Sequence, residues 1–258
     1  MSANEPGQPS VEGRRLASVD LEVPRIALAV GAHPDDIEFG CGGTLAKWAA
    51  AGCLVHHAVL TDGSKGTWNP RADIVALVAT RQTEQREAAR RLGARGETVF
   101  LGRVDGELRS DEPLRRELTR LIRRLRPDVV LGHDPWKRYR LHPDHREAGL
   151  ALCDSVVAAR DPHFFRDDIE SSGIEHHRPR TMLLWEADEP DHGEDISATV
   201  ETKIRALLAH ESQFESTMKA VSPDEIERFA TRMRERLTRL GQRIDRPAAE
   251  IFKKISDL

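Results

Sequence analysis

This chain of 258 residues contains few cysteines, no long apolar run and no excess of charge of either sign. Its three cysteines, Cys41, Cys53 and Cys153, are widely spaced and form no C-x-x-C pair. An odd number of scattered cysteines does not indicate a disulfide framework. It favours a reducing, cytoplasmic location instead.

Apolar runs long enough to enter a membrane are also missing. The longest stretches, such as 26–30 and 182–185, fall far short of the roughly 20 apolar residues that a spanning helix needs. Residues 1–19 have no apolar core of the kind that a signal peptide carries. We therefore expect no association with a membrane.

Neither sign of charge dominates, because 43 acidic residues against 39 basic ones leave a formal net charge of −4. A protein that coats nucleic acid usually needs a clear basic excess, concentrated on one face. We therefore expect no nucleic-acid partner.

Three common functional motifs are absent as well. The chain has neither a Walker loop, G-x-x-x-x-G-K-[ST], nor the G-x-S-x-G elbow of the usual serine hydrolases. Gly40 and Gly42 could begin the G-x-G-x-x-G fingerprint of a dinucleotide site, but Leu45 stands where the third glycine is required. We expect these glycines to allow close packing of a loop and the helix after it.

The chain does contain a regular alternation of strand-like and helix-like segments. Strands separated by helices predict an α/β fold, in which a mostly parallel sheet is flanked by helices on both faces. Strands are expected at 25–30, 54–60, 98–101, 128–132 and 181–186, and helices at 44–51, 74–92, 112–125, 145–159, 200–214 and 223–243.

The remaining segments complete the expected organisation. Residues 1–22 are polar and contain several prolines and glycines, which predicts a flexible N-terminal tail. Residues 23–258 have a length that fits one large domain. We expect a turn-rich loop over 31–43 and irregular structure over 164–180.

Residues that can carry chemistry follow directly after the first strand. His33, Asp35, Asp36 and Glu38 stand beyond its carboxyl end, where open parallel sheets bind their ligands. A histidine crowded among carboxylates is costly to hold without a counter-charge, which a divalent cation supplies. His33 and Asp36 are three residues apart, so one turn of chain can aim both at one ion.

A second cluster follows the fourth strand. His133 comes directly after that strand, and His142, Asp144 and His145 form an H-P-D-H motif a few residues further on. One of the two motif histidines can complete a His₂Asp zinc site, and the other can serve as an acid or an electrostatic stabiliser. Each cluster alone is compatible with an ordinary turn or helix cap. Two such clusters, each after a buried strand, favour a metal site.

These residues resemble the motifs of the PIG-L/LmbE-like deacetylases, zinc-dependent enzymes that remove acetyl groups from N-acetylglucosamine-type sugars. AHPDDIEFGCGGTLAKWAAAG (32–52) is similar to the first motif of that family, and LHPDHREAG (141–149) is similar to its later motif. Less specific similarity extends the resemblance over roughly residues 25–215. It implies a Rossmann-like α/β fold.

The resemblance also implies the ligands of the metal. His33, Asp36 and His145 match the residues that hold it, and Asp35 matches the general base. Zinc is the implied cofactor, and Fe²⁺ or another divalent ion could occupy the same ligands.

Further roles follow from the same resemblance. His142 matches the histidine that stabilises the oxyanion or acts as an acid, and Asp144 matches the carboxylate that orients this histidine. Lys65 and Asp105 match a basic residue that touches substrate and an acidic residue that binds sugar hydroxyls. Glu38 is left without a role.

The implied function is hydrolysis of the N-acetyl group of a small acetamido-sugar conjugate, and the resemblance implies a homo-oligomer. Two other functions stay open. An amidase that cleaves a thiol–sugar conjugate would use the same residues, and a non-catalytic sugar- or metal-binding module would keep the ligands. Asp35 and His142 argue against a mere binding module, because such a module needs neither a base nor an oxyanion partner.

Overall fold

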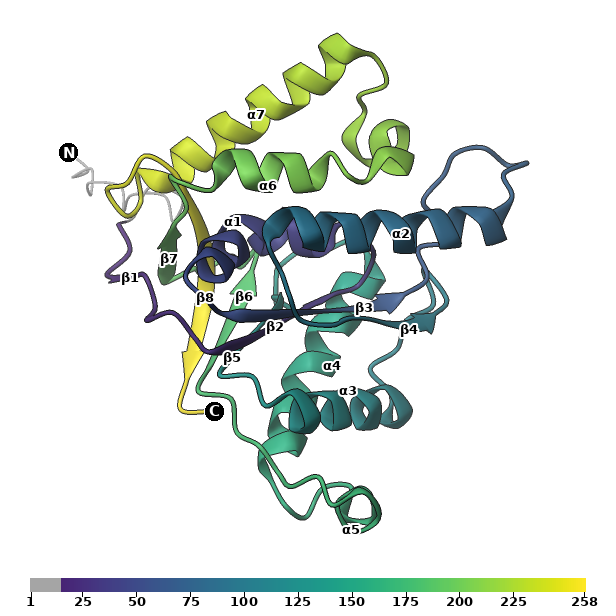
Figure 1. Cartoon of the computed structure of the whole chain (residues 1–258), viewed down its shortest axis with the longest axis vertical. Coiled ribbons are helices and arrows are strands. Elements are labelled where there is room, and N and C mark those ends of the chain that lie inside the picture. The colour runs from purple at the N-terminus through teal and green to yellow at the C-terminus, as the bar shows by residue number, and fades with distance from the viewer. Residues whose placement is uncertain (1–14) are drawn as a thin grey trace, which may run out of the picture.

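A computed structural model of the chain describes residues 15–258, which form an eight-stranded sheet with helices on both faces (Figure 1). The strand order is β1-β7-β8-β6-β5-β2-β3-β4, and neighbours run parallel except that β8 is antiparallel to both β6 and β7. The strands are β1 (Ser18–Val19), β2 (Ile26–Gly31), β3 (Leu54–Thr61), β4 (Thr98–Arg103), β5 (Val129–His133), β6 (Thr181–Trp185), β7 (His192–Asp195) and β8 (Ala249–Ser256).

The helices lie in layers above and below this sheet. Figure 1 shows α1 and α2 against one face, with α6 and α7 stacked outside them, and α3 and α4 against the other face. They are α1 (Asp36–Ala50), α2 (Ile74–Leu92), α3 (Glu112–Leu125), α4 (Pro143–Arg160), α5 (Arg166–Ser172), α6 (Val200–Leu207) and α7 (Pro223–Gly241), with a short 3-10 helix (Glu211–Gln213) and a π-helical turn (Phe214–Met218) between α6 and α7.

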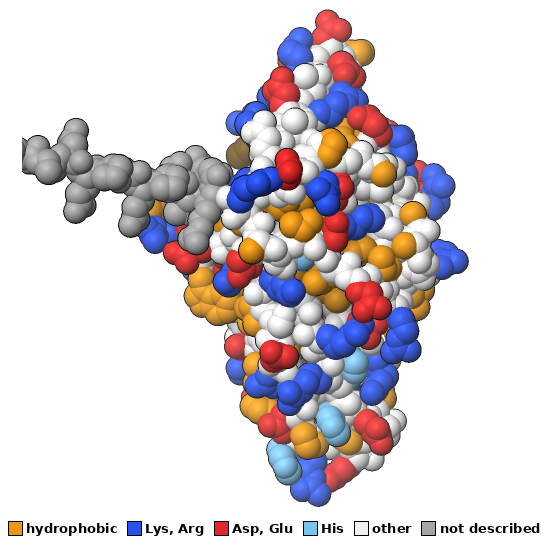
Figure 2. All heavy atoms as spheres, turned by 90° about the vertical axis from the view of Figure 1, so that its left-hand side faces the viewer, with side chains coloured by type: hydrophobic (Ala, Val, Ile, Leu, Met, Phe, Trp, Pro, Cys, Tyr) orange, Lys and Arg blue, Asp and Glu red, His pale blue; other side chains and the backbone are white. Residues whose placement is uncertain are grey.

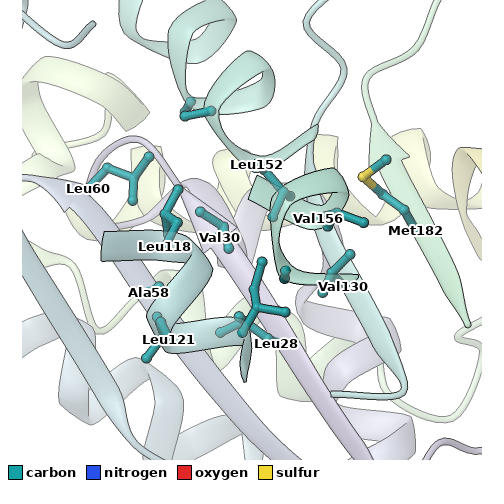
Figure 3. Packing of buried hydrophobic residues seen from close by; sticks show 14 of the residues in the cluster. Leu28, Val30, Ala58, Leu60, Leu118, Leu121, Val130, Leu152, Val156 and Met182 are labelled. Carbon is teal, nitrogen blue, oxygen red and sulfur yellow. The ribbon is translucent and has the colours of Figure 1, made fainter. Parts of the chain in front are cut away.

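Strand β2 separates two apolar cores. Leu28 and Val30 point into the core beneath α3 and α4, where Leu118 packs among them (Figure 3). Ala27 and Ala29 point the opposite way, into the core beneath α1 and α2. Successive side chains of a strand face opposite sides of the sheet, so a strand covered on both faces must be apolar throughout.

The predicted mostly parallel sheet with helices on both faces is confirmed, and some boundaries agree to the residue. Helices α2 and α3 span the predicted segments because the sequence carries their caps. The carboxylates of Asp73 and Asp111 accept the backbone N–H groups of Ala76 (3.0 Å) and Leu114 (2.9 Å). Gly93 ends α2 with φ of 80°, a left-handed conformation that glycine adopts without strain.

Other segments differ from the expectation. Residues 1–14 of the expected tail lie outside the described residues, but Ser18–Val19 forms β1 and pairs with β7, so ordered structure begins before residue 23. Strands β7 and β8 and helix α5 are not predicted. Strand β8 lies inside the sheet, between β7 and β6, but it is not predicted because its sequence contains polar residues such as Lys253 and Lys254.

Helix α1 begins eight residues earlier than predicted, at Asp36 rather than at position 44. The expected loop over 31–43 is therefore wrong from Asp36 onward. Gly40 and Gly43 serve close packing, since a Cβ on Gly40 would lie 2.4 Å from the Trp185 ring and one on Gly43 would lie 2.7 Å from Ile196, whereas Gly42 has room for a Cβ. The helix kinks at Cys41, where φ is −147°.

The surface agrees with the near balance of charges. On the face drawn in Figure 2, basic and acidic side chains are interspersed and neither sign gathers into one continuous area. Among the described helices, none combines the length and the apolar character that a membrane span requires.

Candidate functional site

Both predicted clusters meet at the carboxyl ends of the central parallel strands. His33 follows β2, His133 ends β5, and His142 and His145 stand at the start of α4. These four histidines line one cavity of about 620 Å³, together with Asp35. The cavity lies where the topology of a parallel sheet predicts a ligand site.

Asp36 lies at the centre of the cluster. Its Oδ2 accepts the backbone N–H of His33 at 2.7 Å and lies 3.2 Å from Nδ1 of the same residue. Its Oδ1 lies 3.2 Å from Nε2 of His145. Burial favours the neutral acid, but His145 and His133 outweigh burial and hold the pKa of Asp36 well below its usual range. A carboxylate with an imidazole beside each oxygen suits a shared cation.

His33 is held from its other side by two carboxylates. Its Nε2 lies 3.1 Å from Oδ1 of Asp105 and 3.1 Å from Oδ2 of Asp144. Despite burial, Asp105, Asp144 and Asp36 raise the pKa of His33 well above its ordinary value. A surplus of negative charge around a buried imidazole is an environment in which a divalent cation can replace the proton.

His133 packs beside Asp36 and His145 as a neutral ring. Its Nδ1 accepts the indole N–H of Trp185 at 3.0 Å and lies 3.3 Å from a guanidinium nitrogen of Arg140. The two donors at Nδ1 favour the tautomer with the proton on Nε2, which lies 3.3 Å from Oδ2 of Asp36 and 3.4 Å from the backbone nitrogen of Ala32. Burial lowers the pKa of His133 to about 4, so the ring is neutral at neutral pH.

Donor atoms from several of these residues lie close enough to share one cation. They form three groups whose atoms all lie within 4.8 Å of one another. The predicted ligands are distributed over these groups, with Asp36 between His33 and His145. The groups are His33 with His142 and His145, Asp36 with His133 and His145, and His33 with Asp105 and Asp144.

Asp35 stands beside the cluster in an unusual backbone conformation. Its φ is 103°, a value that costs energy for a residue with a Cβ. Its backbone N–H donates to Oε1 of Gln85 at 3.0 Å, and Arg81 holds the preceding carbonyl of Pro34 at 2.6 Å. Burial raises the pKa of Asp35 to about 6, against the opposing charge of Arg81.

A buried polar chain continues from Asp35 into the protein. The side-chain amide of Gln85 donates to Oε1 of Glu38 at 2.9 Å, and the other oxygen of Glu38 lies 3.2 Å from Nε2 of His210. Sequence reasoning left Glu38 without a role and missed Gln85, Arg81 and His210. The spacing of Arg81 and Gln85, four residues apart on one face of α2, is a signal that could have indicated a shared task.

His142 and Asp144 are placed differently from their expected pairing. The His142 ring is exposed, stacks 4.7 Å from His145, and lies 4.5 Å from His33. Burial of part of this ring, with the charges of His33 and His145, lowers the pKa of His142. Asp144 is fully buried and binds His33, whereas the expectation paired it with His142.

Asp144 is fixed by the backbone of the loop before α3. It accepts the N–H groups of Gly106 at 2.6 Å and Leu108 at 3.2 Å. The neighbouring Asp105 accepts the backbone N–H of Lys65 at 3.0 Å, and the Lys65 ammonium donates to the Asp105 carbonyl. Lys65 and Asp105 both line the cavity, so the two expected substrate residues are brought to it.

The fold and site together define an α/β protein with a candidate metal site, where a mostly parallel sheet gathers histidines and carboxylates around one cavity. A family model described as PIG-L, GlcNAc-PI de-N-acetylase, matches residues 28–156. This match covers the strands and loops that carry the site. The chain belongs to the PIG-L family of deacetylases, and the resemblance seen in the sequence is confirmed.

Individual relatives agree with this assignment. Diacetylchitobiose deacetylase of Thermococcus kodakarensis is 37% identical over 187 residues, which cover 72% of this chain and 69% of that protein. A 1D-myo-inositol 2-acetamido-2-deoxy-alpha-D-glucopyranoside deacetylase of Saccharopolyspora erythraea is 29% identical, covering 79% of this chain and 86% of that protein. The solved N,N'-diacetylchitobiose deacetylase of Pyrococcus horikoshii superposes with a TM-score of 0.81 at 30% identity, covering 90% of this chain and 84% of that one.

Proposed function

We propose that this protein is a metal-dependent hydrolase that removes the N-acetyl group from an N-acetylglucosamine-type sugar conjugate. The observation that carries the proposal is the position of Asp35 beside a cluster of imidazole and carboxylate donors in one cavity. Membership of the PIG-L family, and relatives named as deacetylases of such sugars, support it.

The donor set suits a divalent metal held by His33, Asp36 and His145. Imidazole nitrogens with one carboxylate oxygen are ligands that zinc accepts readily, and Fe²⁺ is the alternative. When bound, such an ion supplies a Lewis acid that polarises the acetamide carbonyl and makes a water molecule easier to deprotonate. We propose zinc as the native ion.

Two carboxylates support the orientation of His33 in this proposal. Asp144 and Asp105 accept a hydrogen bond from Nε2, which leaves Nδ1 of His33 directed at Asp36. Metal-binding histidines commonly donate their second N–H to a carboxylate in this way, and the carboxylate fixes the tautomer. We therefore propose that Asp144 orients His33, in place of the role on His142 that the family resemblance implies.

Asp35 is the proposed general base. Its carboxylate is buried, and with a pKa of about 6 it is ionised at neutral pH yet basic enough to accept a proton from the attacking water. Asp35 then delivers that proton to the departing amine nitrogen. The pKa of His142 is lowered, so its imidazole is the neutral form at neutral pH. We propose that the one N–H of this neutral ring donates a hydrogen bond to the developing oxyanion.

The test is an assay of acetate release from N-acetylglucosamine conjugates, including diacetylchitobiose and an N-acetylglucosaminyl inositol. We expect turnover that a chelator abolishes and zinc restores. Asp35→Asn is expected to lose turnover while its metal content, measured by atomic emission, stays that of the wild type. Asp154→Asn, on the exposed face of α4, is the control.

The outcomes separate the parts of the proposal. Turnover that survives thorough metal removal would contradict a metal-dependent reaction. Loss of metal together with activity in Asp35→Asn would make Asp35 a ligand rather than the base. Release of the larger acyl group from a thiol–sugar amide, with no acetate released from the N-acetyl conjugates, would assign the amidase alternative.

We also propose a single domain over 23–258, a homo-oligomer and a cytoplasmic location. One sheet joins strands from both ends of the described chain, which supports one domain.

Trp136, Tyr139 and Leu141 support the proposed oligomer. Their side chains are 64%, 88% and 94% exposed, and an oligomer contact would cover them. All three cysteines are free, which suits a reducing compartment. Light scattering coupled to size exclusion tests the oligomer.

A further inference from the structure

Helix α1 divides into two segments at Cys41, where φ is −147° and ψ is 16°. The first segment, residues 36–40, carries the proposed metal ligand Asp36 and the fully buried Glu38. The second segment, residues 42–50, continues beneath α6, which Figure 1 shows outside α1. The backbone at Cys41 therefore decides how the first segment is directed toward the histidines of the site.

A buried ion pair takes the place of a helical hydrogen bond at this division. In an uninterrupted α-helix, the Gly43 N–H would donate to the Phe39 carbonyl four residues earlier. Here the Gly43 N–H donates to Oε1 of Glu250 at 2.9 Å, and the Phe39 carbonyl accepts the Lys203 ammonium at 2.7 Å. The ammonium in turn donates to Oε1 of Glu250 at 2.5 Å. The pair is therefore inserted between two backbone groups of α1, which is a recognised cause of helix kinks.

The polarity of the pair matches the two segments that it joins. The Glu250 carboxylate also accepts the backbone N–H of Thr44 at 2.8 Å and its hydroxyl at 2.6 Å, so it caps the start of the second segment. Lys203 donates to a carbonyl at the end of the first segment, where a cation is favourable. Both charged side chains are buried, at 1% and 3% exposure. Only this orientation of the pair satisfies the backbone groups on both sides.

The first segment is joined directly to the proposed ligand and the proposed base. Phe39, whose carbonyl the ammonium holds, donates its own backbone N–H to the Asp35 carbonyl at 3.0 Å. Asp36 begins the same segment, and its Oδ1 lies 3.2 Å from Nε2 of His145. A rotation of residues 36–40 about Cys41 would therefore displace the ligand and the base together.

We propose that Lys203 and Glu250 are positioning residues for the metal site, which act by fixing the direction of residues 36–40. This inference rests on the proposed function and adds to it a support that comes from α6 and β8. Burying an ion pair is costly, and apolar side chains of similar volume often replace one without loss of stability. The benefit of this pair is geometrical, because ligating side chains need a rigid support that holds them in place.

The test measures metal affinity in a variant that loses both charges together. Lys203→Met combined with Glu250→Gln leaves no unpaired charge buried, but it removes the donor to the Phe39 carbonyl. The glutamine also places an N–H donor where a carboxylate oxygen stood. We expect Zn²⁺ to bind about tenfold more weakly or worse, as measured by competition with a fluorescent chelator. The visible spectrum of the Co²⁺-loaded protein should shift, because Asp36 changes direction.

Hydrogen exchange of the metal-free protein detects the same displacement without metal and without turnover. In the double variant, the amides of Phe39, Gly43 and Thr44 should exchange about two- to tenfold faster relative to those of β2, the range expected when one hydrogen bond is lost. Unchanged relative rates would overturn the insertion of the pair into α1.

Lys47→Met is the matched control. Lys47 lies on the second segment of α1 and binds Asp20 and Glu194, so its loss removes an ion pair of the same helix without touching the kink. This variant should lose stability but keep the wild-type affinity for Zn²⁺ and the exchange rates at the kink.

The outcomes separate positioning from mere stability. A folded double variant with wild-type affinity for Zn²⁺ would overturn the positioning role, as would an equal loss of affinity in Lys47→Met. If the double variant does not fold, Thr44→Val removes one bond to Glu250 and leaves the pair in place. It should weaken Zn²⁺ binding by a smaller factor, and an unchanged affinity would overturn the inference. A wild-type protein that binds no divalent ion would instead overturn the proposed metal-dependent function.

Discussion

Oε1 of Gln85 accepts the backbone N–H of Asp35 at 3.0 Å, and this bond holds the proposed base in a backbone conformation with φ of 103°. The other end of the same amide donates to Glu38, so Gln85 cannot rotate without breaking both bonds. A strained residue persists only where its surroundings determine its conformation, and Gln85 is part of those surroundings.

Gln85→Leu should therefore lower kcat more than it changes KM or the metal content. We expect kcat to fall roughly 10- to 100-fold, because a small displacement of a catalytic group can cost that much. KM and metal content should stay near the wild-type values. Gln82→Leu, on the same helix without these contacts, is the control, and an equal fall in both variants would contradict a role for Gln85 in positioning Asp35.

The two histidines of the H-P-D-H motif should separate by metal content. His145→Ala is expected to lose the metal because its Nε2 faces Asp36. His142→Ala should keep the metal and lower kcat by about 10²–10³, the usual cost of losing one oxyanion donor. Metal analysis after dialysis distinguishes them. Metal loss in His142→Ala would instead support the group of His33, His142 and His145 as ligands.

Asp144→Asn should weaken metal binding. An asparagine can still accept a bond from His33 but supplies no charge, and such changes next to a ligand typically reduce metal affinity about 10- to 100-fold. Competition with a fluorescent chelator measures the change, with Asp154→Asn as the control. Unchanged metal affinity combined with a lower kcat would instead support the role that the family resemblance implies, in which Asp144 orients His142.

His210 should make stability depend on pH. Burial opposes its charged form, but Glu38, Asp35 and Glu84 outweigh burial and raise the pKa of His210 above its ordinary 6.5. A group whose pKa is raised by folding stabilises fully below its unfolded pKa and loses this contribution as pH rises through its folded pKa. The wild type should therefore have a higher free energy of unfolding than His210→Gln. This difference should be largest near pH 5.5 and should shrink as the pH rises.

Urea unfolding of both proteins between pH 5.5 and 9 gives that difference directly. His176→Gln, which removes an exposed histidine, controls for the loss of the residue type. A difference that grows with pH would contradict the assignment.

The buried pair of Lys203 and Glu250 should be sensitive to loss of either partner. Lys203→Met leaves a carboxylate buried without its counter-charge, and we expect a loss of about 3–5 kcal/mol in the free energy of unfolding. The double variant Lys203→Met, Glu250→Gln should recover part of it. Denaturant titration measures both, with the exposed Lys219→Met as the control, and a loss below about 1 kcal/mol would contradict the expected cost of an unpaired charge.

The elements that sequence predicts well are those whose signals are local. Helix α2 carries its cap at Asp73 and its ending glycine at Gly93, and β2 is apolar on both faces. Both histidine clusters follow strands, so the rule that parallel strands gather ligands at their carboxyl ends was enough to bring them together.

The elements that sequence misses depend on distant contacts. Three glycines argue against a helix over 36–43, yet Trp185 and Ile196 leave no room for a Cβ at Gly40 and Gly43 where the helix crosses them. Gln85 and His210 come from separate segments, and only the folded chain places both on Glu38. The contact between Asp144 and His33 is equally invisible, because the motif places Asp144 next to His142 along the chain.

Strand β8 has a consequence for the order of events during synthesis. It follows every other described element, and β7 and β1 join the sheet only through it. Its Glu250 also accepts the N–H groups of Gly43 and Thr44, which anchors the helix that begins at Asp36. A nascent chain can pair β6-β5-β2-β3-β4 beforehand, but α1 gains its hydrogen bonds to Glu250 only after β8 has been synthesised.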